Sequence, residues 1–180
     1  MQAPRRIRVV GTSGAGKTTF AKAVAARLGL PCLELDAIFW DAGWKHRDDA
    51  EALGLLANFL NGPGANGWVI DGNWNGRLGD TLRDADAIVW LDFPRPLVMR
   101  RVIWRTLWRG VTRRELWHGN RERLSNMFRR DPEQNIILWA WIDHATKRVL
   151  YGERVARDER IVRMQSPTQA KRWLRELGSQ

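Results

Sequence analysis

The sequence predicts an α/β fold of the P-loop NTPase type, in which helices cover both faces of a five-stranded parallel sheet to give three layers. Two observations predict it. Short β-branched runs alternate with longer helical patterns between residues 6 and 164, and a glycine-rich motif joins the first strand to the first helix. The 180 residues suffice for one domain, so residues 1–180 are expected to fold together.

Five strands can be placed from the apolar runs: Ile7–Val10, Cys32–Leu35, Trp68–Ile70, Ala87–Leu91 and Arg160–Met164. We expect them in the order 2-3-1-4-5. An aspartate follows each of the three middle strands, namely Asp36, Asp71 and Asp92. The carboxyl ends of parallel strands meet at the edge where such sheets bind ligands, so this edge is the expected site.

The helical patterns are separated by turn signals. A first helix over 17–28 should end at Gly29 and Pro31. The other expected helices are 47–61, a helix that begins after Pro94, a long stretch to Tyr151 broken near Asp131–Pro132, and a last helix capped by Thr168 that packs Trp173, Leu174 and Leu177 on the sheet. Residues 110–123 are polar and basic with two glycines and predict a mobile lid, and residues 36–67 are the expected acceptor-binding segment.

The stretch GTSGAGKTT contains the phosphate-binding motif G-x-x-x-x-G-K-[ST] directly between a strand and a helix. Its glycines let backbone N–H groups face phosphates, and the following helix adds its unpaired N-terminal donors. The lysine reaches the β- and γ-phosphates and the first threonine binds Mg²⁺. The residues predicted to contact the nucleotide here are Gly11, Thr12, Ser13, Gly14, Ala15, Gly16, Lys17, Thr18 and Thr19.

A carboxylate beside the loop should orient magnesium and its waters. In WVIDGNW, Asp71 follows three apolar residues and fits this role, with Thr18 as the second metal ligand. Asp92, after AIVWL, is the alternative. It is followed by FPRP, which is more typical of a strand-to-helix turn, so Asp71 ranks first.

Arg101, Arg105 and Arg109 recur every four residues on one predicted helix face. Like charges at this spacing repel unless an anion lies between them, and a triphosphate is such an anion. Together with Arg113 and Arg114 of the lid they predict a set of arginines that closes over the γ-phosphate. A solvated basic face is the other interpretation.

The stretch LDAIFWDAGW follows the second strand. Asp36 is placed to contact an acceptor hydroxyl or a magnesium-bound water, and Phe39, Trp40 and Trp44 are candidates for an aromatic wall, of which one or two should line a site while the rest join the core. The three histidines, His46, His118 and His144, show no spacing pattern and are predicted to be ordinary polar residues.

The formal net charge is +10, with 25 arginines and five lysines, which indicates an anionic partner or ligand unless it reflects the coding genome. No run reaches about 20 apolar residues and the N-terminus lacks a signal-like apolar stretch, so we expect a cytoplasmic protein. The single cysteine, Cys32, lies in an apolar run and is predicted to be a small core residue.

No base-reading N-K-x-D segment is present, and no second acidic residue follows Asp71 to polarise a water. Transfer to an acceptor other than water is therefore favoured.

With these motifs in order, the chain resembles the adenylate-kinase-like P-loop kinases, and within them the topology-modulation, FlaR-like group. The resemblance covers nearly the whole chain. Its most specific part is the combination of LDAIFW, a later GW, and WVIDGNW. It implies ATP and Mg²⁺ as cofactors, a phosphotransferase activity, and a nucleotide or small-molecule acceptor.

The resemblance also implies roles for single positions. Asp36 would lie near magnesium or the acceptor, and Asp71 corresponds to the aspartate of the family's D-G-F-P-R segment. The arginine of that segment, which holds an acceptor phosphate in the family, has no counterpart in register. Arg77 is the candidate substitute, and this departure weakens the case for a nucleoside monophosphate acceptor.

For the nucleotide, the resemblance places one of Arg101 and Arg105 against adenine and the other on the phosphates, and both are predicted to be catalytic beside Lys17 and Asp36. It places Arg113 or Arg114 in the lid, and the turn QSP with Ser166 at the border of the adenine. The predicted function is phosphate transfer from ATP. The alternative is a nucleic-acid-binding protein that uses ATP as a conformational signal, since RRVIWRTLWRG interleaves tryptophans with arginines. The sequence leaves the acceptor and the oligomeric state open.

Overall fold

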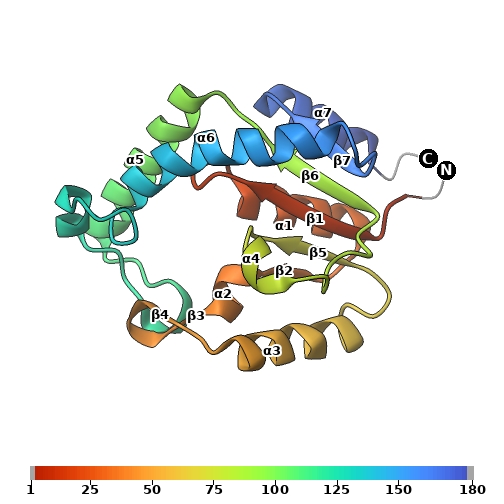
Figure 1. The fold of residues 1–180 in the computed structure, drawn as a ribbon, viewed down its shortest axis with the longest axis horizontal. Helices are drawn as coiled ribbons and strands as arrows, with labels where there is room; N and C mark the ends of the chain where they lie inside the picture. The colour runs from red at the N-terminus through yellow and green to blue at the C-terminus, as the bar shows by residue number, and fades with distance from the viewer. Residues whose placement is uncertain (1–2, 178–180) are drawn as a thin grey trace.

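The computed structural model describes residues 3–177. Its centre is a parallel sheet in the order β2-β5-β1-β6-β7 (Figure 1). These strands are β1 (Arg6–Gly11), β2 (Cys32–Glu34), β5 (Trp68–Asp71), β6 (Ala87–Leu91) and β7 (Ile161–Met164). In chain order they are strands one to five, so the predicted order 2-3-1-4-5 is confirmed. Two short strands, β3 (Trp40–Asp41) and β4 (Lys45–His46), pair antiparallel outside this sheet.

The α-helices of the described residues are α1 (Lys17–Leu28), α2 (Leu35–Phe39), α3 (Asp49–Asn61), α4 (Asn75–Leu78), α5 (Arg95–Thr112), α6 (Ile136–Val155) and α7 (Pro167–Glu176), of which α7 follows the last strand. Three short 3₁₀ turns are η1 (Ala42–Trp44), η2 (Trp117–Gly119) and η3 (Leu124–Phe128). None of the helices within residues 3–177 combines the length and apolar character that crossing a membrane requires.

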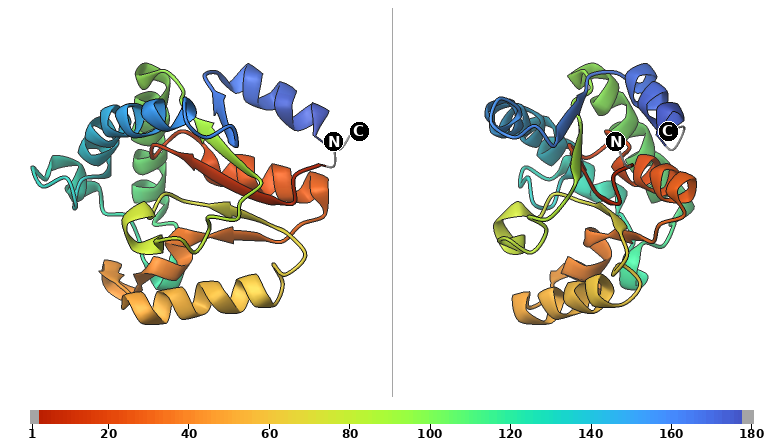
Figure 2. Two further views of the ribbon diagram at one scale, coloured as in Figure 1. Left: turned by 45° about the vertical axis from the view of Figure 1, so that its right-hand side comes forward. Right: turned by 90° about the vertical axis from the view of Figure 1, so that its right-hand side faces the viewer.

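The two faces of the sheet carry separate cores because successive strand residues point to opposite sides. Val9 of β1 packs with α1, α7 and the start of α5 on one face. Val10 packs on the other face with Trp90 and with Tyr151 of α6. The view along the sheet edge shows α6 on one side and α1 with α7 on the other, which gives the three predicted layers (Figure 2).

Several boundaries differ from the predictions, and three of the differences concern the residues discussed below. Strand β2 ends at Glu34, because Leu35 already begins α2, so Asp36 lies in a helical turn. Helix α5 continues to Thr112, three residues into the segment predicted as a lid, and ends where Arg113 adopts a left-handed backbone. The last helix is capped by Ser166, whose hydroxyl accepts the N–H of Gln169. The prediction of Thr168 as the cap is wrong, because Pro167 takes the first helical position and the cap must precede it.

Between α5 and α6 the chain folds back on α5. Gly110 allows this approach, since a Cβ at that position would collide with the side chain of Leu124 in η3. The predicted break near Asp131–Pro132 is confirmed, and Asn135 then caps α6 by accepting the N–H groups of Ile137 and Leu138. This return brings α6 alongside α5, over the carboxyl edge of the sheet.

Candidate functional site

The phosphate loop lies where the sequence predicted it, between the end of β1 and the start of α1. Gly11, Gly14 and Gly16 all have positive φ angles. A Cβ at Gly14 would lie 2.8 Å from the carbonyl oxygen of Val98, so α5 packs directly against the loop and only glycine fits there. No side chain caps the first turn of α1 and no acidic residue occupies that turn, so its N–H donors and positive dipole end face the loop.

Lys17 and Thr18 occupy the first turn of α1. The Nζ of Lys17 lies 3.4 Å from the carbonyl oxygen of Thr12, which places the ammonium group across the loop. The Thr18 hydroxyl donates a short hydrogen bond to Oδ2 of Asp71. Two of the residues predicted around magnesium are therefore in direct contact.

Asp71 ends β5 and is only 5 % exposed. Its Oδ1 is buried without a hydrogen-bond partner. Burial raises the pKa of Asp71, while the charge of Lys17 and the Thr18 hydrogen bond partly oppose this effect. An ionised carboxylate held in such a place favours a cation beside it.

The residues present fit a magnesium ion. A hydroxyl and a carboxylate oxygen are hard donors, and magnesium in phosphate sites commonly has only one or two protein ligands besides water and phosphate. The unpartnered Oδ1 of Asp71 supplies a free donor atom. Within residues 3–177 no cluster of three or more His, Cys, Asp or Glu side chains could hold a metal ion.

Asp92, the alternative metal residue, is used differently. It is 3 % exposed and accepts hydrogen bonds from Arg148 of α6 and Arg163 of β7, with shortest distances of 2.8 and 2.5 Å. Its charge is thus already balanced by two guanidinium groups. This favours Asp71 for the metal.

The predicted arginine series on α5 divides into two parts. Arg101 donates to the carbonyl oxygen of Ala15 at 3.3 Å, and Arg105 contacts the hydroxyl of Ser13 at 3.4 Å, so both reach the phosphate loop. Arg109 instead pairs with Glu122 at 2.8 Å and anchors the segment after α5. Burial and the neighbouring Arg109 lower the pKa of Arg105, and the Nε atom of Arg105 is buried without a hydrogen-bond partner. An anion bound beside Arg105 would supply that partner and stabilise its positive charge.

Other predicted nucleotide contacts lie further out. Arg113 ends α5, and the side chains of Arg113 and Arg114 are both exposed. The Ser166 hydroxyl is engaged as the cap of α7.

The predicted acceptor residues meet around one aromatic cluster. Asp36 accepts a 2.7 Å hydrogen bond from the indole N–H of Trp74. The Trp40 ring makes edge contacts with Trp44, His46 and Trp74, at centroid distances of 5.8, 4.3 and 5.6 Å. Phe39, the third predicted wall residue, is fully buried in the core beneath this cluster.

Arg77, the candidate for holding an acceptor phosphate, is used inside the fold. It pairs with Asp49, donates to the carbonyl oxygen of Arg47, and lies over the rings of Phe39 and Trp74 at 4.8 and 5.4 Å. These contacts use the Nε and Nη2 atoms of Arg77, while its Nη1 is buried without a hydrogen-bond partner.

The segment after α5 lies against the acceptor segment, beside β3 and β4 (Figure 1). The buried Asn120 accepts from the N–H of Trp44 at 3.0 Å and donates to the carbonyl oxygen of Asp41 at 2.8 Å. A ring nitrogen of His118 lies 2.7 Å from the carbonyl oxygen of Ala37. The predicted lid and acceptor segments are thus in contact through polar groups.

Sequence reasoning missed Trp74, Asn73, Asn120 and His118. Asn73 brackets Gly11, accepting its N–H at 3.2 Å and donating to its carbonyl oxygen at 3.0 Å. Asn73 and Trp74 could have been found from the sequence, because they lie in WVIDGNW just after Asp71. No sequence signal marks His118 and Asn120, because their hydrogen-bond partners lie about 80 residues away.

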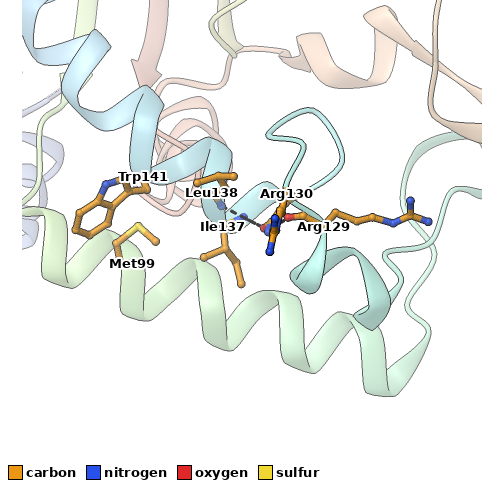
Figure 3. A pocket seen from close by; sticks show the side chains of 7 residues that line it. Met99, Arg129, Arg130, Ile137, Leu138 and Trp141 are labelled. Carbon is orange, nitrogen blue, oxygen red and sulfur yellow. Dashed lines mark hydrogen bonds between the residues drawn. The ribbon is translucent and has the colours of Figure 1, made fainter.

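A hollow of about 590 Å³ lies outside this site, between α5 and α6. Figure 3 shows Met99 on α5 facing Leu138 and Trp141 on α6, with Arg129 and Arg130 at one end. The guanidinium of Arg95 lies 4.5 Å from the ring of Trp141. None of the phosphate-loop residues lines this hollow.

The fold resembles solved kinases. A shikimate kinase from Bacteroides thetaiotaomicron matches with a TM-score of 0.53 and 19 % identity, covering 97 % of this chain and 96 % of its own. A gluconokinase from Sinorhizobium meliloti 1021 matches with a TM-score of 0.53 and 19 % identity, covering 98 % and 95 %. No family model and no curated protein matches the sequence significantly. The chain therefore has the P-loop kinase fold, and at this identity the similarity shows the fold alone.

Proposed function

We propose that this protein is an ATP- and magnesium-dependent kinase of the adenylate-kinase-like, FlaR-like type that transfers the γ-phosphate to a small-molecule or nucleotide acceptor. The observation that carries the proposal is the meeting of three elements at one loop. Arg101 and Arg105 of α5 reach the loop backbone and Ser13, while Thr18 of α1 binds Asp71 of β5 beside it. A phosphate in the loop would be contacted from both sides.

Each group has a chemical role in this proposal. Lys17, Arg101 and Arg105 carry positive charge toward the transferred phosphate, where negative charge develops on the equatorial oxygens. Thr18 and Asp71 hold magnesium, which when bound neutralises charge on the phosphates. Arg113 or Arg114 completes the set from the lid.

The step is an in-line displacement. The acceptor oxygen forms a bond to the γ-phosphorus as the bond from that phosphorus to the β–γ bridging oxygen breaks, and ADP leaves. Asp36 accepts the proton of the acceptor hydroxyl. Contact between the lid and the acceptor segment excludes water and so limits hydrolysis.

Arg77 pairs with Asp49 through part of its guanidinium and keeps one nitrogen, Nη1, without a partner for an acceptor. The half-buried rings of Trp40 and Trp74 suit a ring-bearing alcohol such as a sugar or a nucleoside. The shikimate kinase and the gluconokinase with this fold support a small acceptor by analogy.

The test is ADP production from ATP and magnesium with a panel of nucleosides, nucleoside monophosphates, small alcohols and 5′-hydroxyl oligonucleotides. We expect one class to raise turnover well above the acceptor-free rate, and Lys17→Ala to abolish that increase. Lys171→Ala, an exposed residue of α7, is the matched control for loss of a lysine charge. Turnover retained by Lys17→Ala would refute the assignment.

A second candidate function is nucleic-acid binding, because residues 95–155 contain fourteen basic and six acidic residues, a net +8 of the total +10. This region also exposes four tryptophans, of which Trp104 and Trp108 are 69 % and 57 % exposed. Such rings can stack on bases while arginines track the backbone. Binding of single-stranded DNA and RNA should then fall steeply between 50 and 200 mM salt, and no binding at either salt concentration would exclude this candidate.

A further inference from the structure

Residues 71–74 contact three different parts of the candidate site within four positions. Asp71 accepts from Thr18, Asn73 brackets Gly11, and Trp74 donates to Asp36. The metal side, the entry to the phosphate loop and the acceptor carboxylate are therefore all held by the segment that leaves β5. Of these contacts, the one between Trp74 and Asp36 is the only one aimed at the acceptor segment.

Trp74 is held in a strained backbone conformation. Its φ and ψ are both 26°, a region that residues other than glycine seldom adopt. The indole is fixed by stacking on Phe39, with centroids 4.7 Å apart and ring planes 17° from parallel. Edge contacts to Trp40 and His46, each at 5.6 Å, hold its other sides. The surrounding rings thus fix both the strained backbone and the direction of the N–H bond.

That N–H bond ends on Oδ1 of Asp36 at 2.7 Å. An indole nitrogen only donates, and a carboxylate oxygen accepts, so the two groups are matched as donor and acceptor. Both side chains are half-buried, where a fixed donor is more effective than mobile water. The hydrogen bond also fixes which way the second oxygen of Asp36 faces.

We propose that Trp74 is a positioning residue for phosphate transfer, whose N–H holds the Asp36 carboxylate oriented toward the acceptor hydroxyl. This inference rests on the proposed kinase function. Trp74 acts through Asp36 and touches no reacting atom. Replacing Trp74 should therefore slow the transfer step while leaving ATP binding intact.

The first experiment is a double-mutant cycle with Trp74→Phe and Asp36→Ala on the acceptor found in the panel. Trp74→Phe keeps an aromatic ring for stacking and removes the donor. We expect kcat to fall about tenfold to a hundredfold, the size of effect that a misplaced reacting group produces, with the KM for ATP within twofold of the wild type. In the Asp36→Ala background the same change should alter kcat by less than twofold, because the carboxylate that it positions is gone.

The cycle separates positioning from a merely structural role. If Trp74 only supported the fold, its replacement would cost the same factor with or without Asp36, and the inference would be overturned. Trp40→Phe removes an indole from the same cluster whose ring contacts Trp74, so it reports the effect of lost aromatic bulk. If the effect of Trp40→Phe on kcat depended on Asp36 as strongly as the effect of Trp74→Phe does, a specific role for the Trp74 N–H would also be refuted.

The split between KM and kcat gives a second readout. The KM for ATP should stay within twofold of the wild type in Trp74→Phe while kcat falls, because Trp74 acts through Asp36 and not on the nucleotide. A rise in the KM for ATP as large as the fall in kcat would contradict the proposal.

A third readout needs no activity. In protein labelled with ¹⁵N-tryptophan, the indole resonance lost in Trp74→Phe identifies Trp74. We expect it to shift upfield and to exchange faster with solvent in Asp36→Ala; no response there would overturn the pairing. If the resonance responds but the wild type transfers phosphate to no acceptor, the kinase proposal and the positioning role both fail, while the hydrogen bond itself stands.

Discussion

The hydroxyl of Thr18 donates a hydrogen bond to the carboxylate of Asp71, which joins the first turn of α1 to the end of β5. Asp71 is buried, and its second oxygen has no hydrogen-bond partner. Burial raises the pKa of this carboxyl group, so folding works against its charge. Shifted carboxylates of this kind concentrate at functional sites, because their cost is offset only when a ligand binds.

Asp71→Asn should stabilise the ligand-free protein at neutral pH. It removes a buried charge, and we expect the melting temperature at pH 7.5 to rise by roughly 2–4 °C, the shift that about 1 kcal/mol gives a domain of this size. Because the pKa of Asp71 is raised in the folded state, the penalty from its charge grows as the pH rises through that folded pKa. The penalty disappears below the ordinary value of about 3.9. Thermal unfolding at a series of pH values should therefore show the two proteins converging toward pH 4.

The same variant should respond less to its ligands. Magnesium and ATP together should raise the melting temperature of the wild type clearly more than that of Asp71→Asn, since ligand stabilisation scales with affinity. A lower melting temperature of the variant at pH 7.5 without ligand, or equal protection by magnesium and ATP, would contradict the assignment of Asp71.

Asp92→Asn should have the opposite pattern. Asp92 is hydrogen-bonded to Arg148 and Arg163, and weakening these charge-assisted bonds should cost about 2 kcal/mol. That corresponds to roughly 4–8 °C in melting temperature. Magnesium-dependent ATP binding, measured by calorimetry, should remain within about threefold of the wild type. A selective loss of magnesium dependence in Asp92→Asn would reverse the ranking of the two aspartates.

Arg105→Ala should lower kcat about 10²–10³-fold, the effect of removing one donor that contacts developing charge. Arg105 contacts Ser13 of the phosphate loop, whereas Arg100 on the same helix has an exposed side chain. Arg100→Ala is therefore the matched control, and its kcat should stay within twofold of the wild type. Steady-state kinetics with the identified acceptor measures kcat for both variants. An equal loss of kcat in Arg105→Ala and Arg100→Ala would show that only the overall positive charge of α5 matters, and not the contact of Arg105 with the loop.

The Cys32 thiol should be unreactive in the folded protein. Burial raises the pKa of Cys32 to about 11, so roughly one thiol in a thousand is ionised at pH 8. We expect a thiol reagent such as DTNB to label it slowly in native buffer and within seconds to minutes in 6 M guanidinium chloride. Rapid stoichiometric labelling of the native protein would show that the strand carrying Cys32 opens or is more exposed than in this structure.

Local sequence signals predicted the strands and the glycine-rich loop because each depends on neighbours in the chain. The pattern that makes Val9 and Val10 face opposite cores is a property of a strand, and the glycines of the loop reflect a backbone requirement at each position. The strand order pairs residues far apart in the chain, such as Arg6 and Trp68, so it follows from the fold class and not from a local pattern. The exact ends of helices were harder to predict. The cap of α7 depends on Pro167 as well as on the capping residue, and α5 continues through Gly110, where the side chain of Leu124 packs.

Candidate site residues that a motif carries lie together at the loop after β1, whereas some others are held by distant partners. The sequence placed Arg101, Arg105 and Arg109 on one helix face, but the helix is long enough that Arg109 lies beyond the phosphate loop and pairs with Glu122. Arg77 stays a prediction for an acceptor phosphate. It pairs with Asp49 and lies over the aromatic cluster, and its Nη1 has no hydrogen-bond partner.

The sequence by itself determined the fold class, the phosphate loop and the choice of aspartates at the carboxyl edge of the sheet, since these follow from local periodicity and from motifs a few residues long. Only the tertiary structure decided which aspartate is free for a metal, which arginines reach the loop, and that Trp74 holds Asp36. Those outcomes depend on pairing between residues about 40 to 90 positions apart. No local pattern encodes such pairs, because burial and charge balance are set only when the helices pack on the sheet.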